Sequence, residues 1–433
     1  MLIVPSVVVV GSPAFATSPP ATVCASGCAF GTIQAAINAA APGAIITIAP
    51  GTYVENLVVT TSVSLVGAGD STVLYPAASG PTCASGDSTL CAGSSTMILV
   101  QADNVSISNL RLEGANPSLT GGALVGGVWV NARNGIIENY HAGTFNGTSV
   151  QNVTVSDIYH RAIYMSSGGS GFTIANNSVT NVQGSPSSIA IFNFGGSGVI
   201  AGNHVSYAND AISANWSSGT QFLSNVVTNS GSGIHTDNNG GSGGGADLIR
   251  GNTILQCPTD GYGIFVFAPY VSATVSDNHV SGCAVGLSAF GSQGVGVTTT
   301  FANNRVSGQS AQTTDPFGTY GLFVVTDLLG FGAADVNVIA TGNSIAHFTT
   351  GLFVSQTTTF YNDAPGGHAT VSAAQNSFTL NTVGAFGDSG TTVTATNNWW
   401  GCPQGPTSGS GCDSALGTVT VTPWLTSAPP SMR

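Results

Sequence analysis

Charged side chains are scarce in this sequence. They make up 6% of its 433 residues, whereas about 25% is usual for a soluble domain. Lysine is absent, and the formal net charge is −12. Because nucleic-acid binding depends on clustered Lys and Arg, the composition argues against a nucleic-acid partner and equally against an anionic membrane surface. A strongly anionic polysaccharide would need a local basic patch or bridging cations.

Long apolar runs are also rare. Residues 1–16 form the clearest one, which is too short to span a membrane. It ends in Ala14-Phe15-Ala16, which fits the A-x-A pattern of signal-peptide cleavage. The basic stretch that normally precedes such a run is missing. We predict a signal peptide and therefore a secreted protein without membrane insertion; a buried strand is the alternative.

The chain contains 8 cysteines, an even number, which in an exported protein favours disulfides. Most lie close to another cysteine in the sequence, and Cys257 lies one repeat period before Cys283. A zinc site is the rival interpretation, but neither a CxxC motif nor a Cys-His cluster supports it. The expected pairs are Cys24 with Cys28, Cys83 with Cys91, Cys257 with Cys283, and Cys402 with Cys412.

Helical periodicity is confined to one segment near the N-terminus. Ile33, Ala36 and Ile37 follow the i, i+3, i+4 spacing of an amphipathic helix, and Thr32 is a plausible N-cap. We predict a helix over residues 32–41. Elsewhere, short runs alternate apolar and polar residues and are rich in Val, Ile, Thr and Phe, which is typical of strands.

One short phrase returns along most of the chain: a small or polar residue, then Asn, any residue, and usually Val, Ile or Phe. Self-similarity at a period of 20 to 50 residues is typical of repeat proteins. Each period holds three strand-like runs, enough for one coil of a solenoid. Stacked in register, the Asn amides are expected to form a ladder of hydrogen bonds, and Asn also tolerates the left-handed backbone of a turn. The repeated residues are Asn177, Asn203, Asn225, Asn252, Asn278, Asn304, Asn343, Asn376 and Asn398.

The repeats, together with the N-terminal helix that precedes the first strands, resemble the right-handed parallel β-helix proteins of the pectin-lyase-like superfold, of the secreted bacterial type. The resemblance covers nearly the whole mature chain. It implies an all-β solenoid with a short capping α-helix. We predict a lead-in at residues 17–29, one β-helix domain at 30–425 and a loose tail at 426–433. The superfold hosts lyases, hydrolases, esterases, epimerases and non-catalytic surface proteins, so it decides little about function.

A second repeated phrase places a Gly or Ala before an inward Ile or Leu, and the residue after it should point outward. The charged residues near this phrase form the candidate catalytic set Asp210, His235, Asp237 and Arg161, which would suffice for acid–base work. The alternative is a purely structural role, in which these residues occupy turns or are solvated. His235, Asp237 and Asp247 could instead hold a cation such as Ca²⁺ through oxygen ligands; otherwise no cofactor is expected.

Aromatic residues recur at the same outward position, at Phe265, Phe323 and Phe353, and Tyr164 precedes them. Exposed apolar surface usually marks a binding site, so these rings are the candidate substrate-binding residues; cover by a loop is the alternative. The enzyme signatures of polygalacturonases and pectin methylesterases are missing. The first hypothesis is therefore a monomeric, non-catalytic protein that binds a polysaccharide or cell-surface glycan. A polysaccharide lyase or glycoside hydrolase is the second, and a structural scaffold or adhesin is the third.

Overall fold

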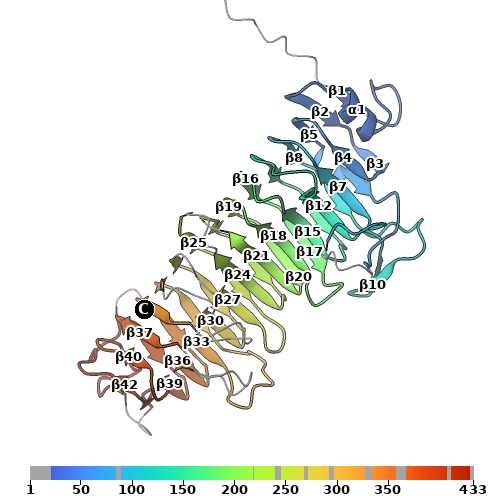
Figure 1. Cartoon of the computed structure of the whole chain (residues 1–433). Coiled ribbons are helices and arrows are strands. Elements are labelled where there is room, and N and C mark those ends of the chain that lie inside the picture. The colour runs from blue at the N-terminus through green and yellow to red at the C-terminus, as the bar shows by residue number, and fades with distance from the viewer. Residues whose placement is uncertain are drawn as a thin grey trace, which may run out of the picture.

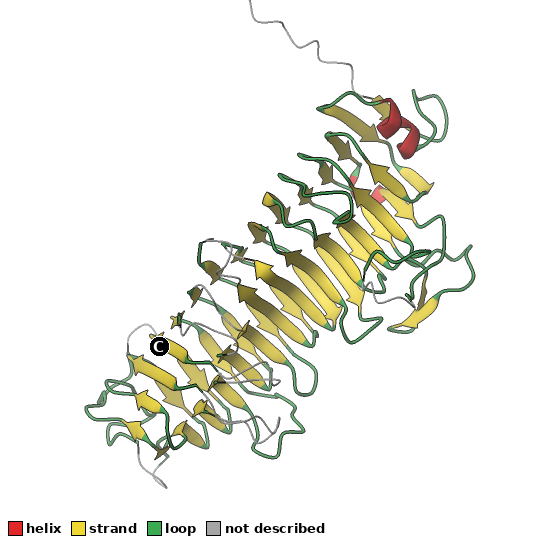
Figure 2. Cartoon of the chain, in the orientation of Figure 1, coloured by secondary structure: helices red, strands yellow, loops and turns green. Residues whose placement is uncertain are grey.

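The computed structural model describes residues 21–83, 89–217, 219–238, 245–267, 272–291, 297–326, 334–356, 367–406 and 411–429. The chain winds into an elongated rod in which successive coils stack along one axis, with the N-terminal part at one end and the C-terminal part at the other (Figure 1). Strands dominate, and the helix lies at the N-terminal end (Figure 2). The predicted signal peptide at 1–16 and residues 430–433 of the predicted tail lie outside the described residues.

Sheet A has 15 strands, and the neighbouring strands described in it pair in parallel. Its strands are β1 (Ala21–Val23), β2 (Ala44–Ile48), β5 (Val63–Val66), β8 (Ser106–Ser108), β13 (Ser149–Gln151), β16 (Ser170–Ala175), β19 (Ser197–Ala201), β22 (Gln221–Leu223), β25 (Asp247–Arg250), β28 (Ala273–Ser276), β31 (Thr298–Ala302), β34 (Val336–Thr341), β37 (Ala369–Ala374), β40 (Thr392–Thr394) and β42 (Val419–Thr420).

Sheet B has 12 strands, also parallel. Its strands are β3 (Gly51–Val54), β6 (Thr72–Tyr75), β9 (Arg111–Glu113), β14 (Thr154–Ser156), β17 (Ser178–Val182), β20 (His204–Ala208), β23 (Val226–Thr228), β26 (Thr253–Leu255), β29 (His279–Ser281), β32 (Arg305–Ser307), β35 (Ser344–Ala346) and β38 (Ser377–Thr379).

Sheet C has 13 parallel strands and carries the candidate site. Its strands are β4 (Leu57–Val59), β7 (Thr96–Val100), β12 (Asn134–Glu138), β15 (Arg161–Met165), β18 (Ile189–Phe194), β21 (Asp210–Ser217), β24 (Ser232–Asn238), β27 (Tyr262–Phe267), β30 (Val285–Phe290), β33 (Tyr320–Val325), β36 (Thr350–Ser355), β39 (Val383–Gly387) and β41 (Ala415–Gly417). A typical coil contributes one strand to each sheet, as the predicted all-β solenoid requires.

The core consists of aliphatic columns, because parallel in-register strands place equivalent residues above one another. In sheet C, Ile163 pairs with Ile191, then with Ile212 and Ile234, and all four are fully buried. Burial of such columns removes apolar surface from water, which stabilises the fold by roughly 25 cal/mol for each Å² buried. The Ile or Leu of the second phrase therefore points inward, as predicted.

The predicted Asn ladder is present and continuous from Asn177 to Asn398. Each amide nitrogen donates to the side-chain oxygen of the next Asn at 2.8–3.0 Å. The left-handed backbone, however, belongs to the residue before each ladder position, for example Asn176 (φ 56°) before Asn177 and Asp277 (φ 57°) before Asn278. The ladder Asn thus satisfies buried backbone groups, and its predecessor makes the turn.

Both ends of the solenoid are covered. Helix α1 (Ile33–Ala39) buries Ile33, Ala36 and Ile37 on the first coils, and Thr32 is its N-cap. The Glu55 carboxylate accepts from the first two backbone N–H groups of the helix at 2.9 Å. At the other end, Trp400 is fully buried and stacks on Phe378. The capping helix is confirmed, and Trp400 packs as a cover for the last coils.

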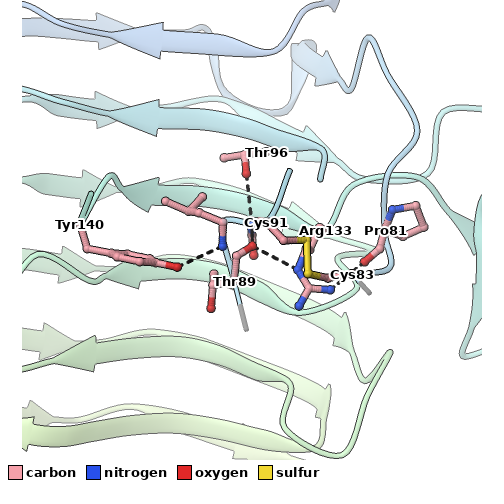
Figure 3. Close-up of a disulfide and its surroundings, with 9 residues drawn as sticks. Pro81, Cys83, Thr89, Cys91, Thr96, Arg133 and Tyr140 are labelled. Carbon is pink, nitrogen blue, oxygen red and sulfur yellow. Dashed lines mark hydrogen bonds between the residues drawn. A yellow bond between two sulfur atoms is a disulfide. The ribbon is translucent and has the colours of Figure 1, made fainter. Parts of the chain in front are cut away.

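All four expected disulfides are present, and no described cysteine is free. Cys257–Cys283 joins adjacent coils, as the repeat spacing predicts. Figure 3 shows Cys83–Cys91 beside Arg133, which donates to the carbonyl oxygens of Pro81 and Thr89. Four disulfides are typical of proteins that fold outside the reducing cytosol. The described part of the chain has no helix of the length and hydrophobicity that a membrane span needs.

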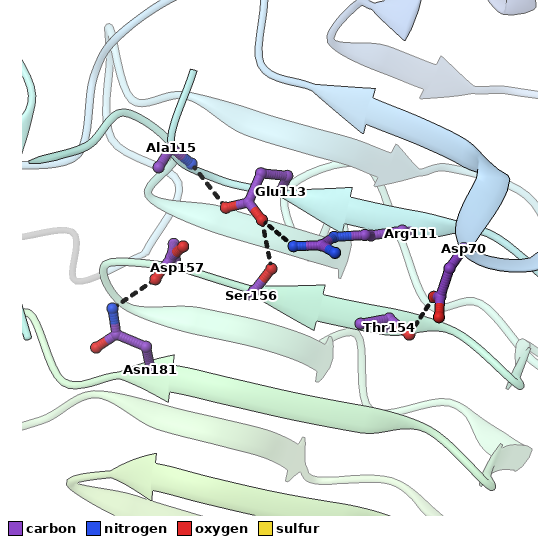
Figure 4. A network of polar contacts seen from close by, with 8 residues as sticks. All are labelled: Asp70, Arg111, Glu113, Ala115, Thr154, Ser156, Asp157 and Asn181. Atoms are coloured by element: carbon purple, nitrogen blue, oxygen red, sulfur yellow. Dashed lines mark hydrogen bonds and ion pairs between the residues drawn. The ribbon is translucent and has the colours of Figure 1, made fainter. Parts of the chain in front are cut away.

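One element has no counterpart in the repeat pattern. Strands β10 (Ala123–Val125) and β11 (Val128–Val130) form an antiparallel hairpin within a segment whose sequence resembles ordinary coils. Asn181 holds it by donating to the carbonyl of Val125 at 3.1 Å. The same side chain donates to Asp157 in the polar network of Figure 4.

Replacement of one ladder residue tests the stabilising role of the amides. Asn278 accepts two hydrogen bonds from Asn252 and donates to Ile249 and Asn304. We expect Asn278→Ala to lower the free energy of unfolding by about 2–4 kcal/mol, because several buried polar groups lose partners. Urea unfolding measures this loss. Asn38→Ala, at an exposed position of α1, is the control, and an equal effect of the two variants would contradict the ladder's role.

Burial raises the pKa of Asp157 to about 6, and its hydrogen bond with Glu113 acts in the same direction. Between pH 4 and 6 the folded chain therefore binds more protons here than the unfolded chain, so this residue makes stability fall as pH rises. We expect Asp157→Asn to reduce the fall in the free energy of unfolding between pH 4 and 7, as measured by urea unfolding. Asp277→Asn is the matched control, because Asp277 has the same φ of 57° and is exposed; an unchanged pH profile in Asp157→Asn would refute the proposed penalty.

Candidate functional site

The outward face of sheet C carries three parallel columns of side chains, which the strand register defines. The middle column is the outward position of the second phrase. The edge column includes Asp210, and the third column includes Asp237. The middle column reads Leu99, Ile137, Tyr164, Phe192, Ser213, His235, Phe265, Ser288, Phe323, Phe353, Phe386 and Leu416.

The structure brings Asp210, His235 and Asp237 together on strands β21 and β24. The Nδ1 atom of His235 lies 3.7 Å from Oδ2 of Asp210. The hydroxyls of Ser213 and Ser232 also donate to the Asp210 carboxylate. These two serines were not predicted from the sequence, because nothing distinguishes them from the many surface serines. Asp210 is thus fixed by three neighbours and in turn fixes the imidazole.

The charges in this cluster move the three pKa values in different directions. Burial opposes charge on His235, but the hydrogen bond and charge of Asp210, with the charge of Asp237, raise the pKa of His235 above its ordinary value. Burial likewise opposes ionisation of Asp210, yet His235 and the two serines hold its pKa below the ordinary value. Burial raises the pKa of Asp237 to about 6, against the charge of His235 and the N–H of Trp216. Such divergence is typical of acid–base pairs.

Two buried polar atoms at this place have no hydrogen-bond partner within the described chain. They are Nε2 of His235 and the side-chain oxygen of Asn215. Asn215 pairs with Asp237 across β21 and β24, so both atoms belong to the same patch of the sheet. Buried polar groups are nearly always hydrogen-bonded, and a ligand hydroxyl can accept from one atom and donate to the other.

The predicted binding rings lie on this outer face, but their ring faces contact one another. Phe323 stacks on Phe353 at 5.3 Å between centroids, and Phe353 stacks on Phe386 at the same distance. Tyr164 is 7% exposed and Phe323 is 8% exposed, whereas Phe265 and Phe353 are partly buried. Stacking along the solenoid axis occupies the faces that a sugar ring would need, so these rings stabilise the outer side of sheet C. Their predicted role in substrate binding stays a prediction.

Arg161 lies two strands away from Asp210 in the edge column. Its guanidinium is 4.9 Å from the centroid of the Phe192 ring and 5.8 Å from that of Tyr164. Burial lowers the pKa of Arg161 to about 10, so it remains cationic at neutral pH. The structure therefore gives Arg161 a packing contact on the aromatic rings, separate from the His235 cluster.

The structure disfavours the alternative cation site that includes Asp247. Asp247 is fully buried, where it accepts from the backbone of Thr220 at 2.8 Å and from the hydroxyl of Thr236 at 2.6 Å. Thr236 lies between His235 and Asp237 on β24, so its side chain points to the opposite side of the strand. Among the described residues, no group of three or more His, Cys, Asp or Glu side chains is arranged to hold a metal ion.

Among the cavities lined by described residues, two lie against the face of sheet C. One of about 480 Å³ lies at its N-terminal end, beside β4 and β7, and His141 is among its lining residues. The other, of about 260 Å³, is lined by Asp260, Tyr262 and Tyr320 among others. Asp260 lies near the second phrase in the sequence, as the candidate catalytic residues do, but the structure places it in this second cavity and not in the His235 cluster.

Replacement of Asp210 tests the electrostatic coupling in the cluster. We expect Asp210→Asn to lower the pKa of His235 by at least about one unit, because the nearby opposite charge is removed while burial remains. NMR titration of the imidazole signals measures this. Asp277→Asn, on the turn between sheets A and B, should leave the titration of His235 unchanged. A pKa of His235 that is the same in both variants would contradict the pairing.

One comparison with known protein families agrees with the fold. A family model described as "Right handed beta helix region" matches residues 134–308. No curated protein matches the sequence.

Among solved structures, a polygalacturonase from Erwinia carotovora ssp. carotovora is 13% identical, with 95% of this chain and 98% of that chain covered and a TM-score of 0.46. The A-module of an Azotobacter vinelandii mannuronan C-5 epimerase is 14% identical, covering 91% and 94%, with a TM-score of 0.42. A surface adhesin of Streptococcus pneumoniae is 14% identical, covering 83% and 87%, with a TM-score of 0.49. Similarity this distant concerns the fold alone. Three stacked parallel sheets run through the described chain, and residues 134–308 match the right-handed β-helix model, so the chain folds as a right-handed parallel β-helix.

Proposed function

We propose that this chain is a secreted glycoside hydrolase that cleaves a polysaccharide at the Asp210–His235–Asp237 cluster, acting as a monomer. The observation that carries the proposal is the pair of buried, unpartnered atoms, Nε2 of His235 and Oδ1 of Asn215, beside two carboxylates of divergent pKa. A sugar hydroxyl both donates and accepts hydrogen bonds. A glycan chain is therefore the ligand class that this patch fits best.

The groups have distinct roles in the proposed reaction. His235, kept cationic by Asp210, donates the Nε2 proton to the leaving glycosidic oxygen. Asp237, when ionised, takes a proton from the attacking water, so that the C–O bond of the glycoside breaks and a new C–OH bond forms. Asp210 is a positioning residue, because its contacts with Ser213, Ser232 and His235 occupy its carboxylate.

Non-catalytic glycan binding is the second candidate. The observation in its favour is the limited access to the imidazole: the side chain of His235 is 16% exposed, and its ring stacks on Phe265 at 4.6 Å. A binding protein needs the hydrogen-bonding atoms of the patch without proton transfer, whereas a hydrolase needs the substrate oxygen to reach Nε2.

A screen of polysaccharides for new reducing ends decides between the two candidates. For the substrate that is cleaved, we expect Asp237→Asn and His235→Asn each to lower kcat by at least about 10²-fold, the usual contribution of an acid or base. Activity should rise with pH as Asp237 ionises near 6 and fall above the raised pKa of His235.

Asp277→Asn is the matched control, since that carboxylate lies on a different side of the coil and should not affect turnover. Full activity in Asp237→Asn would remove the proposed site. Binding of a polysaccharide without any release of reducing ends would favour the non-catalytic candidate.

A further inference from the structure

The cavity of about 260 Å³ beside β27, β30 and β33 lies in line with the His235 cluster. In the edge column, Asp210 pairs with Ser232, which pairs with Tyr262; Val285 and Tyr320 follow. Tyr262 and Tyr320 line the cavity. Since neighbouring strands lie about 4.8 Å apart, the cavity begins one strand from His235 and continues along the axis that an extended glycan would follow.

The walls of the cavity combine aromatic rings with carboxylates that are held in place. Phe323 and Tyr320 pack at 4.8 Å between ring centroids. The Tyr320 hydroxyl donates to Oδ2 of Asp315 at 2.9 Å. Asp260 accepts from Thr313 and from both the backbone and the hydroxyl of Thr314, at 2.6–2.8 Å. Because stacking occupies the faces of these rings, a sugar ring would contact their edges, while its hydroxyls donate to the fixed carboxylates.

The charge of this surface decides which sugars it accepts. Asp260 and Asp315 line the cavity, and its described lining contains no Lys or Arg. Asp210 and Asp237 lie on the neighbouring strands β21 and β24. Arg161 lies in the same edge column as Asp210. Its guanidinium packs on the Phe192 and Tyr164 rings. The hydrogen-bond partners of Asp260 and Asp315 are neutral groups and do not cancel their charge. A uronate or sulfate is therefore repelled by these carboxylates, whereas an uncharged sugar meets no such barrier.

We propose that this cavity is a subsite for an uncharged sugar unit, so that the substrate is a neutral polysaccharide. This inference rests on the proposed function of the adjacent cluster. It also bears on the chemistry: a neutral sugar lacks the carboxylate that acidifies the neighbouring C–H bond in uronates. Elimination is therefore disfavoured for this substrate, and hydrolysis remains.

Binding measured without turnover tests the subsite. In an Asp237→Asn background, calorimetry with neutral gluco-, galacto-, manno- and xylo-oligosaccharides is compared with the corresponding uronate oligosaccharides. We expect one neutral series to bind and the uronates not to bind. Tyr262→Ala should weaken the neutral ligand about tenfold through loss of ring contact, and Trp129→Ala, on the exposed face of the β10–β11 hairpin, should leave it unchanged.

The double variant Asp260→Asn, Asp315→Asn keeps the shape of the cavity and removes its charge. It should therefore reduce the ratio of the affinity for neutral ligands to the affinity for uronates by about tenfold. Binding of uronates as tight as that of neutral sugars, or no binding of any oligosaccharide, would overturn the subsite. Neutral ligands that bind but are never cleaved would refute the hydrolase and leave the subsite supported. Cleavage that is insensitive to Tyr262→Ala and to the double variant would support the hydrolase and refute the subsite.

Discussion

In-register stacking of parallel strands is the constraint on which the rest of this structure depends. Each coil is too thin to bury its own apolar side chains, so it becomes stable only against an equivalent coil. The Asn ladder enforces that equivalence at one corner, because each buried amide needs both the coil before it and the coil after it. A coil shifted by one residue would bury its polar residues and break the ladder.

The same register organises the outside of the rod. Residues separated by one repeat are brought into columns, so the position after each inward Ile or Leu becomes a continuous row on sheet C. Half of the positions in that row carry Tyr or Phe rings, which pack on neighbouring rings, so that these large apolar side chains are covered without entering the narrow core. The rings are interrupted at Ser213 and His235 and again at Ser288, and Asp210 and Asp237 flank Ser213 and His235. The candidate site is thus a local departure from a regular pattern.

Sequence reasoning succeeded where information is repeated. The aliphatic columns, the Asn ladder, the capping helix and the disulfide between adjacent coils each follow from a spacing that recurs along the chain. Features that occur only once in the chain were predicted less completely. The β10–β11 hairpin has no repeated counterpart, and the left-handed turn position was assigned to the ladder Asn when it belongs to the residue before it. The partners of Asp210 could not be identified because serine occurs throughout the sequence.

The sequence by itself determined the period, the direction in which each residue of a strand points, and therefore the fold and the proximity of Asp210 to His235. Tertiary structure alone decided which polar groups are satisfied and which are not. Asp247 is sealed inside by Thr220 and Thr236, whereas Nε2 of His235 lacks a partner in the described chain. The physical reason is that alternation fixes the side of a strand on which a residue lies, but pKa values and hydrogen bonds depend on distances between coils and loops that no spacing in the sequence encodes.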